Sequence, residues 1–447
     1  MIYIKRQLED SCLILLTLLL SLVPATGWAA IQGLSGTNFN FTASSGQISA
    51  ADGDDVFFWG YGVAGQRPQY PGPTLIVQQG NTVTIRLSNR LPQNTSLLIP
   101  GFKVQASGGV AGQITREAPA ASATEAVYSF VADRPGTFGY YSGTNSDLQV
   151  EMGLIGAIVV RPTGFDAAVP TAYGDARTAY DDEFLFLLSE MDPEIHHAVE
   201  IGTDPVATTG FHPVLWFING RNAPDTMAAN NVTWLPNQPY NAMPSIEVGK
   251  RLLARWVGGG RDHHPFHTHG NNFDLIARDG YLLQTTAGAS RQASEMGTVP
   301  DLAVSDFTQN VAPGGSYEGI WSWTGAELGW DMYGHSGTEV GICESGPTPA
   351  TTIDADGFDV NTREYCVDHG KPLPVVLPNA QQLTFGGFYS GSPFLAAEGS
   401  LPPGEGGNNP NAGYAFMWHS HNEKEMTNND IFPGGLMTIM IVNAPGM

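Results

Sequence analysis

Residues 73–87 read PTLIVQQGNTVTIRL, and their pattern organises the rest of the chain. Apolar and polar residues alternate on both sides of Gly80 and Asn81, as expected for two strands joined by a tight turn. Residues 244–256, PSIEVGKRLLARW, repeat the same order: a proline, an apolar strand, a turn and a second strand. This echo predicts the internal duplication of one β-sandwich.

The chain has 447 residues, of which 42% are hydrophobic and 14% are charged, so large cores can form. Its 54 glycines and 31 prolines favour short strands and turns over long helices. We therefore predict an all-β protein with two similar antiparallel sandwiches, formed by residues 31–164 and 180–447. The turn-rich residues 343–413 are interpreted as a long, loop-rich insertion in the second sandwich.

The first residues have the features of a secretory signal peptide. Lys5 and Arg6 precede the apolar run CLILLTLLLSLVPA, and small residues suited to cleavage follow. We assign residues 1–29 to this signal and predict secretion to the periplasm or beyond the cell. The alternative is a membrane anchor, but the run is short for a bilayer span. No later stretch is apolar enough to cross one.

The two cysteines that follow the signal, Cys343 and Cys366, most simply form one disulfide in an oxidising compartment. The alternative, a redox or metal–thiolate pair, lacks the close spacing typical of such sites. The net charge of −23 argues against nucleic-acid binding and against anionic membranes. An acidic surface instead favours positively charged partners, either metal cations or a basic redox or surface protein.

Histidines form two tight groups. HHPFHTHG contains His264, His267 and His269, and MWHSH contains His419 and His421. On an extended strand, residues two apart point to the same face, so each group aims two imidazoles in one direction. Two such strands side by side would bring four imidazoles together, which suits copper or zinc.

These motifs resemble those of multicopper oxidases. HPFHTHG is similar to the third copper motif of that family, and WHSH is similar to the fourth. The text WHSHNEKEMTNNDIFPGG also resembles secreted members from metal-respiring bacteria. The resemblance implies cupredoxin-like Greek-key sandwiches, of which this chain has room for two. It further implies that His264 is a type 1 copper ligand and that His267, His269, His419 and His421 are trinuclear ligands.

The first and second copper motifs of the family are degenerate in this chain. The positions of their histidines are occupied by Leu98 and Pro100 in the first motif, and by Tyr141 and Gly143 in the second. Half of the eight imidazoles of a trinuclear cluster are therefore absent, and all that remain lie in the second domain.

The blue-copper ligands are also incomplete. Ser420 stands where the family has its cysteine, and serine cannot supply the soft thiolate of a blue site. The second type 1 histidine aligns with Glu425 when counted forward from His421, or with Ile431 when aligned backward from GGLM. Neither register supplies an imidazole, so the family route of oxygen reduction is not expected.

Three functions remain open. The first is a metal-binding protein that holds about one copper ion per chain, or zinc, at a residual four-histidine site of His267, His269, His419 and His421. The second is an oxidoreductase with altered copper chemistry. The third is a metal-free structural or interaction module on the same scaffold.

Overall fold

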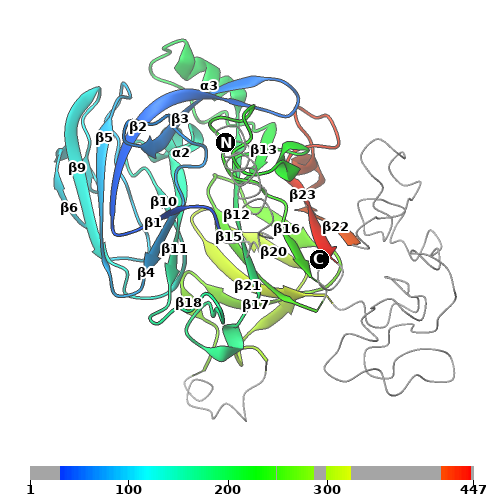
Figure 1. Cartoon of the computed structure of the whole chain (residues 1–447). Helices are drawn as coiled ribbons and strands as arrows, with labels where there is room; N and C mark the ends of the chain where they lie inside the picture. The colour runs from blue at the N-terminus through cyan, green and yellow to red at the C-terminus, as the bar shows by residue number, and fades with distance from the viewer. Residues whose placement is uncertain (1–30, 248, 286–297, 324–413, 444–447) are drawn as a thin grey trace, which may run out of the picture.

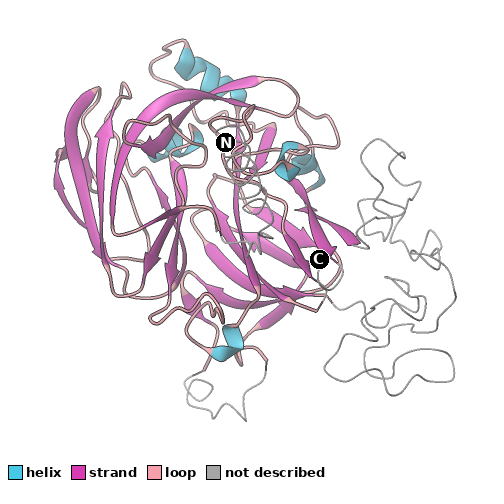
Figure 2. Ribbon diagram, viewed as in Figure 1, coloured by secondary structure: helices cyan, strands magenta, loops and turns pink. Residues whose placement is uncertain are grey.

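The computed structural model describes residues 31–247, 249–285, 298–323 and 414–443 (Figure 1). The predicted signal peptide, the insertion at residues 343–413 and both predicted disulfide cysteines lie outside these residues. The described chain is built mainly from strands, with short helices at the edges (Figure 2). This confirms the all-β, cupredoxin-like fold class. No helix in the described part is both long and apolar enough to span a bilayer.

The first half forms two packed sheets and a small hairpin. One sheet has the order β1-β4-β11-β10 and the other β3-β2-β5-β9-β6. The elements are β1 (Leu34–Ser35), β2 (Asn38–Ser49), β3 (Asp55–Val63), β4 (Leu75–Gln78), β5 (Thr82–Asn89), β6 (Gln105–Gly108), β7 (Val110–Ala111), β8 (Arg116–Glu117), β9 (Ser122–Val131), β10 (Gly136–Tyr141), α2 (Ser146–Glu151) and β11 (Ile155–Arg161).

The second half repeats this arrangement. A sheet of order β13-β12-β15-β21-β17-β18, with β19 paired to β17, faces a sheet of order β14-β23-β22-β16-β20. The elements are η1 (Ala176–Thr178), β12 (Asp182–Met191), α3 (Pro193–Glu200), β13 (Leu215–Ile218), η2 (Asp225–Met227), β14 (Ser245–Glu247), β15 (Arg251–Gly258), β16 (His264–Thr268), β17 (Phe273–Arg278), β18 (Tyr281–Leu282), β19 (Val304–Asp306), β20 (Thr308–Val311), β21 (Ser316–Ser322), β22 (Tyr414–Ser420), η4 (Glu423–Met426) and β23 (Met437–Asn443).

The two echoing sequences occupy equivalent places. In each half, the tight turn carries the chain from one sheet to the facing one: β4 and β5 lie in different sheets, as do β14 and β15. β5 pairs parallel with β2 and antiparallel with β9, while β15 pairs parallel with β12 and antiparallel with β21. The topology thus supports the predicted duplication.

The expectation of purely antiparallel sandwiches was wrong. Five strand pairs in the described chain are parallel: β1–β4, β4–β11, β2–β5, β12–β15 and β14–β23. The reason is the sheet switch itself. A strand that crosses to the facing sheet joins neighbours that are distant in sequence, so its direction is not set by a hairpin.

Apolar side chains fill each sandwich and the seam between them. The second core is aromatic, with Trp256, Trp321, Trp418 and Phe266 fully buried. A separate cluster joins residues of the first half to β12, β13 and β15. In Figure 1 the sheet with β12 and β15 lies between the first-half sheets and the sheet with β16 and β22. The histidine-bearing sheet is therefore on the far side of the second sandwich.

Buried ion pairs cross the same seam. Arg161 of β11 donates to Glu183 of β12 at 2.7 Å, and Arg255 of β15 donates to Glu183 at 3.0 Å. Arg255 also pairs with Glu318 of β21 and donates to Thr137 of β10 at 3.0 Å. Burial alone would lower the pKa of Arg255, but the charges of Glu183 and Glu318 outweigh it and raise that pKa.

Replacing Arg255 with Met should lower the free energy of unfolding by about 3–5 kcal/mol, because the buried Glu318 loses its cation and Glu183 keeps only Arg161. Urea denaturation measures this loss. Lys250→Met is the matched control, since Lys250 and its partner Asp181 are 49% and 40% exposed and such pairs contribute about 1 kcal/mol or less. Equal effects of the two substitutions would contradict a stabilising role for the buried network.

Candidate metal centre

β16 carries histidines on both of its faces. Along this strand His264, Phe266 and Thr268 are buried, whereas His267 is only partly buried. Because successive side chains alternate between faces, His264 points into the core and His267 points outward. β22 pairs antiparallel with β16, and His267 lies directly opposite His419. This register brings the two predicted histidine motifs together.

Three imidazoles converge at this point. One ring nitrogen from each of His267, His269 and His419 lies within 4.8 Å of the other two, and Nε2 of His269 is 3.1 Å from Nε2 of His419. Two nitrogens bound to one copper or zinc ion are separated by about 4 Å at most, given metal–nitrogen bonds of about 2.0–2.1 Å. The three rings therefore fit a single ion with little movement.

Backbone carbonyls orient two of these rings. Nδ1 of His267 lies 2.8 Å from the carbonyl oxygen of Phe307, and Nδ1 of His419 lies 2.6 Å from that of Ser420. A carbonyl can only accept, so each Nδ1 carries the proton and each Nε2 presents its lone pair. Such outer contacts fix the tautomer and orientation of metal-binding histidines.

The two oriented rings are neutral at physiological pH. Burial lowers the pKa of His267 to about 4, aided by the neighbouring His269 and His421. Burial also lowers the pKa of His419 to about 4, aided by His269 and His267. Only the neutral form binds a metal, so both side chains are ready for binding without losing a proton.

His421 stands at the rim of this group. Its ring centre is 4.9 Å from that of His267, and its Nδ1 lies 3.3 Å from Glu423. The side chain is about half exposed. We use "histidine centre" for His267, His269 and His419, with His421 as its outer member.

His264 lies apart from the histidine centre in a buried ion triad. Its Nδ1 is 2.9 Å from Glu425, and its Nε2 is 2.9 Å from Glu190. Burial alone would lower the pKa of His264, but hydrogen bonds and charges from Glu190 and Glu425 raise it to about 10. The ring is therefore a cation with both of its nitrogens engaged by carboxylates.

The two residues that the sequence left as alternatives, Glu425 and Ile431, lie in different surroundings. The short helix η4 turns the chain back after β22 and places Glu425 against His264, whereas Ile431 is 65% exposed. Glu425 is also held by the side-chain amide of Asn422 at 3.0 Å. Glu190 was missed by the sequence analysis because it lies on β12, distant in sequence. Its only signal was an acidic residue directly after the apolar run FLFLL and Ser189.

Of the four first-half positions compared with copper motifs, Leu98, Tyr141 and Gly143 lie close together. Leu98 and Tyr141 exchange backbone hydrogen bonds of 2.7 and 3.1 Å. A Cβ atom added at Gly143 would lie 2.6 Å from the Leu98 side chain, so leucine fills this space. Pro100 is exposed. These four residues offer no imidazole, and their sheets lie across the seam from β16 and β22 (Figure 1).

Comparisons with known proteins agree with this geometry. Residues 60–164 match the family model described as multicopper oxidase. The chain is 24% identical over 252 residues to a probable nitrite reductase–hydroxylamine oxidoreductase fusion protein of Kuenenia stuttgartiensis, covering 52% of this chain and 26% of that protein. It is 32% identical over 130 residues to copper resistance protein A of Escherichia coli, covering 29% and 19%. The matches thus span about a fifth to a quarter of these two relatives.

Solved structures share the fold. The multicopper oxidase mgLAC superposes with a TM-score of 0.53 at 16% identity, covering 93% of this chain and 87% of that chain. The blue copper oxidase from Nitrosomonas europaea gives a TM-score of 0.51 at 16% identity, covering 92% and 86%. The sandwiches and the family match define a cupredoxin protein. Residues 60–164 are thus similar to a multicopper oxidase domain, and the described chain has a cupredoxin-like fold.

The ion triad predicts a specific dependence of stability on pH. The pKa of His264 is raised in the folded state, so its contribution is complete below the unfolded pKa of about 6.5. That contribution is lost as the pH rises toward about 10. Between pH 7 and 10, the free energy of unfolding should therefore fall more steeply in the native protein than in His264→Gln.

Denaturant titrations at several pH values measure this difference. His197→Gln is the control, because His197 is an exposed histidine near Glu200, and its profile should parallel that of the native protein. Parallel profiles for His264→Gln and the native protein would show that His264 is not a buried cation.

Proposed function

We propose that this chain is an exported protein that binds one copper ion, with zinc as the alternative, at His267, His269 and His419. The observation that carries the proposal is the convergence of three ring nitrogens within 4.8 Å. His421 is available as a fourth, exchangeable ligand from the rim. The similarity of residues 60–164 to a multicopper oxidase domain supports copper over zinc.

The residues around the centre have defined tasks. The carbonyls of Phe307 and Ser420 keep Nε2 of His267 and His419 directed at the metal position. The backbone pairing of β16 with β22 sets the distance between the two rings. Copper, when bound, would supply a redox-active Lewis acid at the surface of the second sandwich.

Four-electron oxygen reduction by the family route is not part of this proposal. The electron-entry position holds Ser420 and the triad of His264, Glu190 and Glu425 in place of a thiolate and two imidazoles. A cation fixed between two carboxylates carries charge but cannot cycle between oxidation states. Electrons therefore lack the family's path to the histidine centre.

A second candidate, an oxidoreductase with altered copper chemistry, is favoured by the open geometry of the centre. Three fixed ligands leave a coordination position for water or a substrate, as catalytic metal sites do. Turnover with oxygen or an artificial acceptor separates this candidate from simple metal binding. A protein that binds no metal would indicate the structural module.

Export follows from the predicted signal at residues 1–29, and it gives the centre access to metal outside the cytoplasm. The net charge of −23 favours cations and basic proteins as partners and disfavours nucleic acid. The physiological partner of this proposal is thus the metal ion itself, with a basic redox or surface protein as a further candidate.

Metal analysis tests the proposal directly. Protein purified without a His-tag should bind about one Cu²⁺ per chain in equilibrium dialysis, and His267→Ala with His419→Ala should abolish binding. The matched control combines His197→Ala with His212→Ala, because both of these histidines are exposed. Tight binding that survives the first double substitution would place the metal elsewhere.

Copper binding should also persist at unusually low pH. An ordinary imidazole is largely protonated below about 6.5, but the pKa values of His267 and His419 are about 4. The part of the affinity that His267 and His419 supply should therefore change little between pH 7 and 5.5 and decline as the pH approaches 4. A steep loss near pH 6.5 would argue against the buried, neutral rings.

Ser420→Cys should restore neither blue colour nor oxygen consumption. Ser420 is fully buried, and the two nitrogens of His264 are engaged by Glu190 and Glu425. A new thiolate would thus lack the two imidazoles of a blue site. The measurements are a visible spectrum of the copper-loaded variant and oxygen uptake with a phenolic or metal-ion donor. Robust turnover would show that the missing ligands come from elsewhere.

A further inference from the structure

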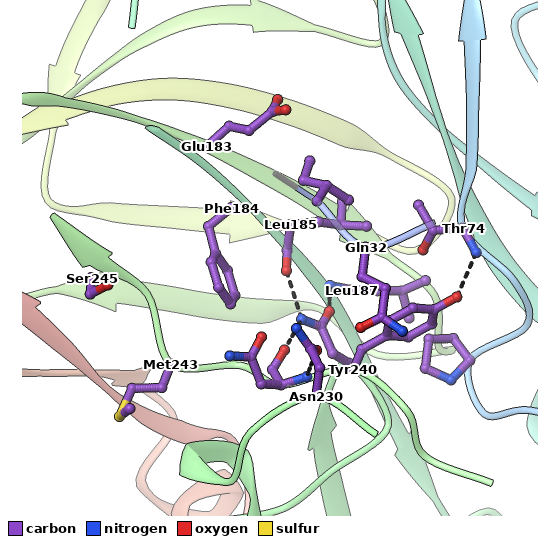
Figure 3. A pocket seen from close by; sticks show the side chains of 14 residues that line it. Gln32, Thr74, Glu183, Phe184, Leu185, Leu187, Asn230, Tyr240, Met243 and Ser245 are labelled. Atoms are coloured by element: carbon purple, nitrogen blue, oxygen red, sulfur yellow. Dashed lines mark hydrogen bonds between the residues drawn. The ribbon is translucent and has the colours of Figure 1, made fainter. Parts of the chain in front are cut away.

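A second cavity lies apart from the histidines, where the first half of the chain meets the second (Figure 3). Its volume is about 150 Å³. One wall comes from residues 31–32 and 71–74 of the first half, another from β12, and a third from the segment that leads into β14. Figure 3 shows Phe184 and Tyr240 on different sides of this space.

The third wall is held rigidly by a buried arginine. Arg221 is fully buried and donates to the carbonyl oxygens of Gln238 at 2.8 Å, Ala228 at 2.7 Å and Ala229 at 3.1 Å. These bonds fix the loop that carries Asn230, Tyr240 and Asn241. A preformed wall reduces the ordering cost of binding.

Asn219 ties this loop to β12. Its side-chain amide donates to the carbonyl oxygens of Leu185 at 2.7 Å and of Asn241 at 2.8 Å, and its Oδ1 accepts from the amide of Leu187 at 2.8 Å. Asn230 adds a further bond, accepting the backbone amide of Asn241 at 2.7 Å. The backbone groups of Leu185, Leu187 and Asn241 are thus hydrogen-bonded within the protein and do not need a ligand.

Several neutral polar groups remain available. Among the residues that the structure describes, no hydrogen bond is made by the side-chain amide of Asn241, the NH₂ group of Asn230 or the hydroxyl of Ser245. All three residues line the cavity. Phe184, Leu185 and Met243 supply an apolar surface in the same space.

The lining offers no free charge. Glu183 is the acidic residue of the lining, and its carboxylate is engaged by Arg161 and Arg255. Burial raises the pKa of Tyr240, so its hydroxyl stays neutral. A charged ligand would lose hydration here without gaining a partner of opposite charge.

We propose that this cavity binds one neutral, polyhydroxylated ring, such as a single pyranose residue. A cavity of about 150 Å³ accommodates a six-membered ring, and the open mouth allows substituents to project outward. The amides of Asn230 and Asn241 and the hydroxyl of Ser245 match sugar hydroxyl groups. The apolar wall matches the C–H face of the ring. This site is independent of the histidine centre.

Saturation-transfer NMR of the full chain with methyl glucoside tests the proposal. We expect saturable transfer with millimolar affinity, weakened about fivefold in Asn241→Ala and in Ser245→Ala, the effect of one lost neutral hydrogen bond. Asn81→Ala is the matched control, because Asn81 is an exposed asparagine on the turn after β4, and it should bind like the native protein. If Asn241→Ala disturbs the loop, Ser245→Ala still tests the proposal, because Ser245 lies in β14.

Methyl glucuronide and phenol complete the test. The glucuronide carries a negative charge and should bind at least fivefold more weakly than the glucoside, while phenol should show no dependence on Asn241. Absence of saturable transfer from the glucoside, or equal affinity in all variants, would overturn the proposal. Equal binding of glucuronide and glucoside would also overturn it. Copper binding to the histidine centre should remain unchanged throughout.

Discussion

The buried triad of His264, Glu190 and Glu425 is the constraint on which the second sandwich depends. It joins three elements that are distant in sequence, β12, β16 and η4, at a fully buried point. A single buried charge would be strongly unfavourable, but a cation between two carboxylates with both of its N–H groups satisfied is not. The imidazolium thus links the three elements electrostatically at the centre of the sandwich.

The sequence was sufficient for the strands and the duplication because both rest on local periodicity. The alternation around Gly80 is a period-two signal, the segment around Gly249 repeats its order of residue types, and each turn does join two strands. Periodicity could not predict whether neighbouring strands are parallel or antiparallel. Whether β5 lies parallel to β2 depends on which sheet each strand joins, and that is decided by packing across the sandwich.

The grouping of the histidines could be predicted from their spacing, because the two histidines of a His-x-His motif point to the same face of a strand. The register of β16 against β22, which brings His267 opposite His419, needed the fold. Glu425 could not be distinguished from Ile431 because the intervening η4 is a short irregular turn with no periodic signal. Glu190 was inaccessible for a different reason: its partner is 74 residues away in sequence, and only the folded sheet reveals the contact.

The alternation of β16 also explains how one site can be lost while another is retained. His264 and Phe266 belong to the core face, and His267 belongs to the outer face. Ser420 lies opposite Phe266, and Glu425 contacts His264, so both residues lie on the core side of the strand. They leave the backbone pairing that positions His267 and His419 intact. The core-side surroundings of His264 and the outer imidazole group of His267, His269 and His419 are thus physically separable, because they lie on opposite faces of one strand pair.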